Sequence, residues 1–295
     1  MRKLGSRPQR TLGRAVEIRG VGFVTGTDVN VRFRPAPPHS GLMFVRTDLP
    51  GKPAIPAAVA NVTGANRRTT LGRPPAQVEL VEHVLAALHG LHIDNCTMEI
   101  NGPELPGLDG SAAGFTELLC AAGNTAQRAR REIWSVDEPI TVADGSATLT
   151  IHPTDSLELR ISYLMDYGPR SPIPRQRHTL DLTPVNFLNQ IASSRTFLLQ
   201  DEAEQLRQLG WGARVTESDL LIFGPHGPLG NELRYDDEPA RHKVLDIVGD
   251  LALVGHSLCG HVVAYRSGHA LNAALGRKLA QAIARREPMV ELTAA

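Results

Sequence analysis

One stretch in the last quarter of the chain limits the fold more than any other. Apolar side chains recur at a helical spacing over residues 238–254, with Pro239 in the first turn and Gly255 just past the end, and this pattern predicts a buried helix. On that helix His242 and Asp246 lie four residues apart and share a face. Burying an imidazole and a carboxylate is costly unless each is paired or bound to a cation. The fold must therefore supply a partner for both.

Two interpretations of this pair are open. A nitrogen of His242 and an oxygen of Asp246 can bind one metal ion together, and this donor chemistry suits zinc. The alternative is a plain hydrogen bond between the two side chains on a solvated helix face, which is the more common origin of an isolated H-x-x-x-D. The pair alone does not decide between a metal site and a structural contact.

A second polar pair lies in an earlier segment. Apolar residues recur at spacings of three and four over residues 77–88 and Gly90 follows, which predicts an amphipathic helix that carries Glu82 and His83. Neighbouring side chains on a helix point about 100° apart, so the two are poorly placed to bind one ion together. We expect His83 to bind a metal ion and Glu82 to bind the water on that ion. His269 lies between a predicted strand and a predicted helix, a common place for catalytic groups.

The order of predicted elements repeats along the chain. With 295 residues, 42% of them apolar, the chain can build two domains. In each half a run of strands is followed by a helix, a strand and a helix. We therefore expect an α+β protein of two similar domains whose matching helices meet at the interface. The expected parts are a flexible N-terminus at 1–9, a first domain at 10–127 and a second at 128–290, divided at the polar run 124–132.

Composition excludes several classes of protein. Lys+Arg and Asp+Glu are both 31, so the chain lacks the basic field that binding to nucleic acid requires. Cys96, Cys120 and Cys259 show no C-x-x-C spacing and predict buried thiols in a reducing compartment, the cytoplasm. No window approaches the length of a transmembrane helix, and no apolar run follows the basic N-terminal residues. We expect no stable membrane insertion.

Five blocks, in order and in spacing, resemble one family. These blocks are residues 81–83, 101–104 with 108–113, 194–197, 241–250 and 267–272. Together they are similar to UDP-3-O-acyl-N-acetylglucosamine deacetylases, the zinc enzymes of the committed step of lipid A biosynthesis. The similarity extends from about residue 10 to residue 279. It implies two domains packed helix to helix, each with a β-sheet layer and two main helices, and a site between them.

The resemblance also implies a role for each matching residue in catalysis. The zinc ligands would be His83, His242 and Asp246, and Glu82 would be the general base. His269 would be the general acid or electrostatic partner, oriented by Asp250, and Thr196 would hold the tetrahedral intermediate. This chemistry suits the residues, because three protein ligands leave one position open for water and a nearby carboxylate can remove its proton. A histidine can protonate the leaving nitrogen.

For the substrate, a UDP-linked acylated glucosamine, the resemblance implies a second set of contacts. Phe197 would border the sugar and the acyl group, Lys243 would meet the diphosphate, and Tyr167 would stack on the uracil. A β-α-β insert at about residues 197–223 would wall the acyl-chain passage. We expect the protein to be a monomer.

The chain also departs from the family pattern. The departures are Val24 in place of a usual His, Leu80 in place of a usual Thr, His152-Pro153 in place of Lys-Pro, and the run 212–215 in place of Gly-Gly-Ser. They bear on acyl-chain length, diphosphate binding and substrate identity. One alternative is a zinc amidohydrolase that acts on a different N-acyl nucleotide sugar, and another is a non-catalytic protein that binds nucleotide sugars. The choice between zinc and iron also stays open.

Overall fold

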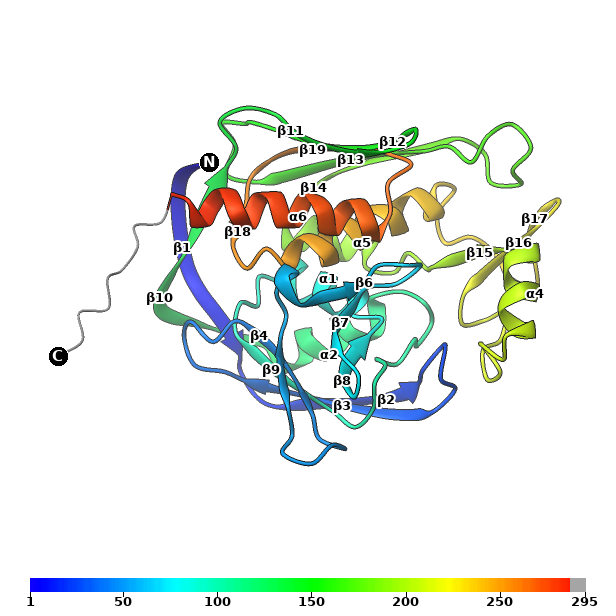
Figure 1. Ribbon diagram of the computed structural model, residues 1–295, viewed down its shortest axis with the longest axis horizontal. Coiled ribbons are helices and arrows are strands. Elements are labelled where there is room, and N and C mark those ends of the chain that lie inside the picture. Colours follow the sequence, from blue (N-terminus) through cyan, green and yellow to red (C-terminus); the bar gives the residue numbers. More distant parts are fainter. Residues whose placement is uncertain (287–295) are drawn as a thin grey trace.

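Two five-stranded sheets enclose most of the main helices. The computed structural model describes residues 1–286. In Figure 1 one sheet lies at the top and the other at the bottom, with α1 (Glu82–Gly90), α5 (Glu238–Ala252) and α6 (His269–Ala284) between them. Helix α2 (Ala113–Ala122) packs against α1 and the first sheet. The expected α+β class is confirmed, and the expected domain limit at 290 lies outside the described residues.

Both large sheets have the same strand order and directions. The first has the spatial order β2 (Val16–Val21), β3 (Asp28–Pro35), β9 (Cys96–Ile100), β4 (Leu42–Arg46), β5 (Ala54–Pro56). The second has the order β11 (Ile140–Asp144), β12 (Ala147–His152), β19 (Gly260–Tyr265), β13 (Leu159–Met165), β14 (Gln176–Asp181). In each sheet the third and fourth strands are parallel and all other neighbours are antiparallel.

Helix α5 lies at the centre of the core, against α1. Its apolar side chains are almost fully buried, as their helical spacing predicts. Gly249 allows the close approach of the two helices, because a Cβ at this position would lie 2.1 Å from the backbone oxygen of Glu82. Any larger residue would push α5 away from the first turn of α1.

Smaller elements complete the chain. One three-stranded sheet contains β6 (Val62–Gly64), β7 (Thr70–Arg73) and β8 (Ala76–Glu79). Another contains β15 (Phe197–Leu199), β16 (Leu221–Gly224) and β17 (Gly227–Pro228). Short helical turns are η1 (Val59–Asn61), α3 (Pro184–Asn186) and the π-helical η2 (Phe187–Ile191). Within residues 1–286 no helix combines the length and the apolar character that crossing a bilayer requires.

The expected β-α-β unit projects from the second half of the chain. Strands β15 and β16 pair in parallel, and α4 (Gln200–Gln208) connects them. Figure 1 shows this unit at the right edge of the molecule. We call β15, α4, β16 and their connections, residues 197–224, the insert.

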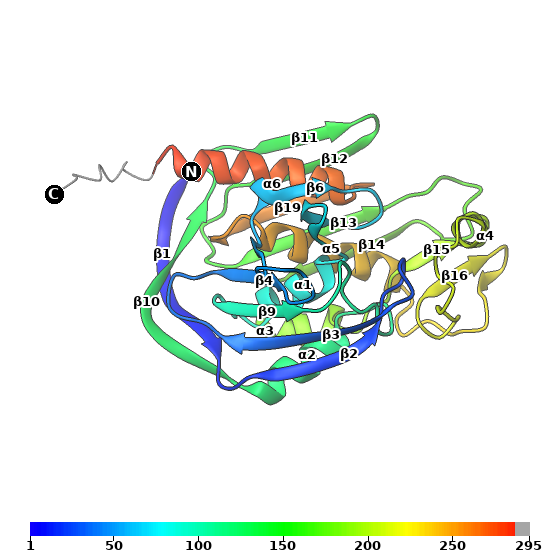
Figure 2. The same ribbon diagram turned by 60° about the horizontal axis from the view of Figure 1, so that its bottom comes forward.

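The expectation of a flexible N-terminus is wrong. Residues 2–12 form β1 (Arg2–Leu12), which pairs with β10 (Asn124–Ser135), and β10 also pairs with β18 (Ser257–Leu258). The polar run 124–132, expected to be a boundary segment, is thus part of a long strand. In Figures 1 and 2 both strands extend along the same side of the molecule. The two strands are held together by backbone hydrogen bonds, and many of their side chains face solvent. Neither strand therefore needs the alternation of apolar and polar residues from which a strand is predicted in a sequence.

The helix expected from residue 77 begins later. Residues 76–79 are strand β8, Leu80 has a positive φ of 60°, and α1 starts at Glu82. Val78 is fully buried as a strand residue that pairs with Leu71. Its spacing from Val81 therefore resembled a helical repeat by coincidence. The late start puts Glu82 in the first turn of α1.

Candidate active site

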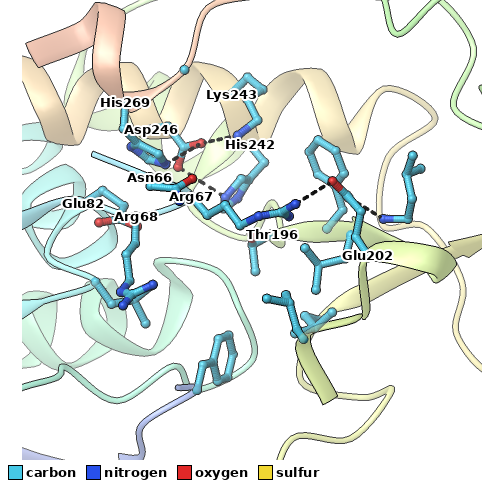
Figure 3. Close-up of a pocket in the computed structure, with 18 of the residues that line it drawn as sticks. Asn66, Arg67, Arg68, Glu82, Thr196, Glu202, His242, Lys243, Asp246 and His269 are labelled. Carbon is cyan, nitrogen blue, oxygen red and sulfur yellow. Dashed lines mark hydrogen bonds and ion pairs between the residues drawn. The ribbon is translucent and has the colours of Figure 1, made fainter. Parts of the chain in front are cut away.

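Six polar side chains meet where α1, α5 and the start of α6 come together. We call this group the helix junction: Glu82, His83, His242, Asp246, Asp250 and His269. All six are buried, with exposed fractions of 1–7%. Figure 3 shows Glu82, His242, Asp246 and His269 around the inner end of a cavity. The structure thus brings together residues that lie far apart in the sequence.

Three of these residues are placed to hold one metal ion. His83, His242 and Asp246 each offer a ligand atom, and these atoms lie within 4.8 Å of one another. Burial and the neighbouring His242 lower the pKa of His83 to about 3, so its imidazole is neutral, as a metal ligand must be. His83 Nδ1 and Asp246 Oδ1 are buried and have no hydrogen-bond partner. Such atoms are costly unless a cation binds them.

The tautomer of His242 strengthens the case for a cation. Its Nδ1 lies 2.9 Å from the carbonyl oxygen of Ser194, so Nδ1 carries the hydrogen and donates it. On the opposite side of the ring, Nε2 lies 3.3 Å from Asp246 Oδ1, and an imidazole that keeps its hydrogen on Nδ1 can offer the Nε2 lone pair to a cation. A divalent cation placed between Nε2 and Oδ1 would be a shared binding partner for both atoms. A set of two imidazoles and one carboxylate fits zinc.

The second oxygen of Asp246 is held by a lysine. Lys243 Nζ donates to Asp246 Oδ2 over 2.8 Å. Burial raises the pKa of Asp246, but Lys243 and His242 outweigh it and hold the pKa well below its usual range. Burial likewise lowers the pKa of Lys243, and Asp246 more than reverses this effect. Both side chains therefore stay charged.

Glu82 has the properties of a base. The backbone N–H of Thr69 donates to Glu82 Oε2 over 3.0 Å and fixes the carboxylate. Burial raises the pKa of Glu82 to about 7, although His269 opposes this shift. A carboxylate with this pKa can accept and release a proton near neutral pH.

His269 has the opposite character. Its Nδ1 lies 2.9 Å from Asp250 Oδ2, which leaves Nε2 free on the other side of the ring, 3.9 Å from Asp246 Oδ2. Burial lowers the pKa of His269, but the carboxylates of Asp250 and Asp246 outweigh it and raise the pKa to about 9. Its imidazole is therefore protonated at neutral pH. Asn272 Nδ2 also donates to Asp250 Oδ2, over 2.8 Å, and holds the carboxylate in place.

Sequence reasoning missed Thr69. Its backbone N–H binds Glu82, and its hydroxyl donates to Asp250 Oδ1 over 2.6 Å, so one residue joins the base to the partner of His269. Thr69 is 1% exposed. The only signal in the sequence is the pair Thr69-Thr70, whose polar character gives no indication of a buried position.

Three further predicted residues line the outer part of the site. Thr196 is fixed by its backbone, which donates to Gly110 O over 2.7 Å and accepts from Leu221 N over 2.9 Å. The ring of Phe197 lies edge to face with that of His242, at a centroid distance of 6.4 Å, and with that of Tyr167, at 6.2 Å. Tyr167 is 51% exposed and marks the edge of the site.

The helix junction opens into a cavity of about 610 Å³. Its inner end is polar, whereas the insert contributes an apolar wall: Leu198, Leu199, Ala203, Leu206, Trp211, Val215, Leu220 and Ile222. Of the departures from the family pattern, Val24, Leu80 and Gly212 line this cavity. His152 does not, because it lies at the far end of β12 from the cavity residue Ala147 and pairs with His261.

Comparisons with known proteins agree on one family. Residues 9–281 match the family model described as UDP-3-O-acyl N-acetylglycosamine deacetylase. A UDP-3-O-acyl-N-acetylglucosamine deacetylase of Myxococcus xanthus (strain DK1622) is 39% identical over 277 residues, covering 92% of this chain and 86% of that protein. A protein of the same description from Citrifermentans bemidjiense is 38% identical over 272 residues, covering 92% and 88%. One from Anaeromyxobacter dehalogenans (strain 2CP-C) is 39% identical over 272 residues, covering 92% and 87%.

Proposed function

The chain belongs to the UDP-3-O-acyl-N-acetylglucosamine deacetylase family of lipid A biosynthesis, and from this premise we propose how its own residues perform the reaction. The enzyme is an amidohydrolase that hydrolyses the acetamide at the 2-nitrogen of the sugar. Water attacks the acetyl carbon, the C–N bond breaks, and acetate and a free amine leave. One observation supports this assignment most strongly: the unpartnered buried ligand atoms of His83 and Asp246 beside Nε2 of His242.

In this proposal His83, His242 and Asp246 hold the zinc ion of the family. When bound there, zinc acts as a Lewis acid that polarises a carbonyl and lowers the pKa of a water. The buried Lys243–Asp246 contact keeps the Asp246 carboxylate ionised and ready to bind a cation.

Glu82 and His269 move the protons. Glu82 takes a proton from the attacking water, since its raised pKa suits a base near neutral pH. His269 has Asp250 on its Nδ1, so its Nε2–H faces the cavity and donates to the leaving nitrogen. Until that transfer its positive charge stabilises the negative charge that develops on the acetyl oxygen. Thr196 supplies a hydroxyl for the same oxygen.

The proposed substrate contacts are divided between the polar and the apolar part of the cavity. The polar end takes the acetamide, and the apolar wall of the insert takes the 3-O-acyl chain. Phe197 lies between the metal ligand His242 and the outer Tyr167, and so would border the sugar. The ammonium of Lys243 would meet the diphosphate, and the ring of Tyr167 would stack on uracil.

We also propose that the two halves are similar domains of a duplicated unit, the first from about residue 10 to about residue 127, within β10, and the second from about residue 128 onward. The identical strand order of the two large sheets supports this. We propose a monomeric enzyme, because all the groups that the mechanism uses lie in one chain. We propose a cytoplasmic location, because Cys96, Cys120 and Cys259 are free thiols, as in a reducing compartment. Cys96 and Cys259 are buried as expected, whereas the expectation of a buried thiol is wrong for Cys120, which is exposed.

A direct assay tests the reaction and its alternative. The purified protein, with its metal content measured, is incubated with UDP-3-O-acyl-N-acetylglucosamine and, separately, with other N-acyl nucleotide sugars. Mass spectrometry should show loss of acetyl from the first substrate only, with one zinc ion per chain. Faster turnover of another N-acyl nucleotide sugar would favour the alternative amidohydrolase, and zinc binding without turnover of any substrate would point to a binding protein.

A further inference from the structure

Two arginines of the first half of the chain reach the insert across the cavity. Arg67 Nη2 donates to Glu202 Oε1 on α4 over 3.0 Å. The guanidinium carbon of Arg68 lies 4.9 Å from the ring centroid of Trp211. All four residues line the cavity, and Figure 3 shows the side chain of Arg67 extending toward Glu202. We call Arg67, Arg68, Glu202 and Trp211 the clasp.

The first-half side of the clasp is firmly fixed. Arg68 Nε donates to Glu79 Oε2 over 2.5 Å. The next residue is Thr69, whose backbone and hydroxyl bind Glu82 and Asp250. Arg67 has a positive φ of 62°, a conformation that non-glycine residues keep only where the surroundings impose it. The loop that carries both arginines is thus tied to the catalytic groups.

The insert side is held less firmly. Strand β16 joins the main core through Leu221 and Phe223, but Ala203 is the only buried residue of α4, and it belongs to a small separate cluster with Leu220 and Ile222. Glu202 has two contacts: Oε1 binds Arg67, and Oε2 accepts from the backbone N–H of Leu199 at the start of α4. A contact from the first half therefore acts on the first-turn residue whose carboxylate caps α4, the helix of the apolar wall.

The exposure of the clasp decides what it can do. The side chains of Arg67 and Glu202 are 42% and 35% exposed. Ion pairs at this exposure contribute little to the free energy of unfolding. The same pair nevertheless fixes the direction in which α4 faces the cavity, because Ala203 is the only buried side chain of α4. Its effect should therefore fall on the fit of a bound chain rather than on folding.

We propose that the clasp determines acyl-chain specificity. It closes the apolar passage on the side of the first half and holds α4 at the distance that suits one range of acyl chains. This inference rests on the proposed function, since it concerns the 3-O-acyl chain of that substrate. Arg67 and Glu202 are positioning residues, because they act through the apolar wall and not on the acetamide.

The test compares Arg67→Ala with wild type on UDP-N-acetylglucosamine and on a series of its 3-O-acyl esters of increasing chain length. Loss of the pair should raise KM for the preferred ester by about three- to five-fold, the equivalent of one exposed ion pair. The kcat for that ester should not change, nor should kcat/KM for the sugar without an acyl chain. The preference among chain lengths should broaden.

Two variants make the result specific. Arg67→Lys can still reach Glu202 and should restore most of the wild-type preference. Arg160→Ala is the matched control, because it breaks an ion pair with Asp181 whose side chains are similarly exposed, 54% and 41%. Neither residue lines the cavity. This variant should leave KM and the chain-length preference unchanged. Trp211→Ala should broaden the preference in the same way as Arg67→Ala.

The inference is overturned if Arg67→Ala keeps the wild-type chain-length profile, or if activity falls equally with and without an acyl chain. Failure of the proposed function gives a different result, since wild type itself would then deacetylate no ester of the series.

Discussion

The helix junction and the insert face the same cavity, but their side chains are held in different ways. In the helix junction the polar groups beside the proposed metal ligands have buried partners: Asp250 binds Thr69, His269 and Asn272, and Glu82 binds the backbone of Thr69. In the insert, β16 reaches the main core, whereas α4 depends on a small apolar cluster and on contacts at partly exposed side chains. Hydrolysis of an amide needs groups fixed within a fraction of an ångström, whereas a flexible acyl chain needs a wall that can adapt. The difference suggests that the two tasks can be altered separately.

The largest effect on activity should come from replacing Asp246, one of the three proposed metal ligands. Asp246→Ala removes one ligand and leaves Lys243 without its buried partner. We expect stoichiometric zinc to be lost and turnover to fall to background, as measured by metal analysis and the deacetylation assay. Retention of one tightly bound zinc per chain would exclude Asp246 as a ligand.

Glu82→Gln should separate metal binding from catalysis. The amide can still accept the Thr69 N–H but cannot take a proton from water, so kcat should drop by about 10²–10⁴-fold. Zinc content should remain that of wild type. Undiminished turnover in this variant would remove Glu82 from its role as the base.

The pH profile tests the paired roles of Glu82 and His269. Glu82 must be deprotonated and His269 protonated, so kcat/KM should rise through the pKa of Glu82, about 7, and fall through that of His269, about 9. A bound cation shifts both limbs to lower pH. Asp250→Asn removes the carboxylate that raises the pKa of His269. The falling limb should then move to lower pH, and activity should decrease by about 10–100-fold. An unmoved falling limb would contradict the assignment of His269.

A substitution at the contact between α1 and α5 should have the smallest effect on catalysis but should clearly lower the stability of the fold. Gly249→Ala places a Cβ 2.1 Å from the backbone oxygen of Glu82, so the helices must separate. The free energy of unfolding should decrease by about 1–3 kcal/mol. Gly276→Ala is the matched control on α6, where the nearest atom is a Val59 methyl at 3.3 Å and little should change. Equal urea denaturation midpoints for the two variants would show that this close approach is not required.

The same contrast explains which features the sequence could predict. Helix α5 was recognisable because a buried helix repeats its apolar residues at a regular spacing, and polar residues on such a helix stand out. The family blocks then connected His83 and His269 to it, although those residues are distant in sequence. Thr69 was not recognisable, because its importance comes from contacts with three separate segments and not from its neighbours.

Strands without an apolar face are the elements that the sequence pattern fails to predict. Strands β1 and β10 pair over a long stretch, but their sequences are rich in arginine and polar residues, which indicate a solvated end or a boundary. Strand β8 was assigned to a helix because a left-handed turn at Leu80 interrupts the chain between two apolar segments. Local spacing carries no information about such a turn, or about backbone pairing between distant polar segments.

The division of the metal ligands between the halves has a consequence for biosynthesis of the enzyme itself. His83 leaves the ribosome long before His242 and Asp246, so a nascent chain that ends ahead of α5 has only one of the three ligands. On this proposal the complete zinc site forms only when α5 docks onto α1. We therefore expect a chain that ends ahead of α5 to lack deacetylase activity.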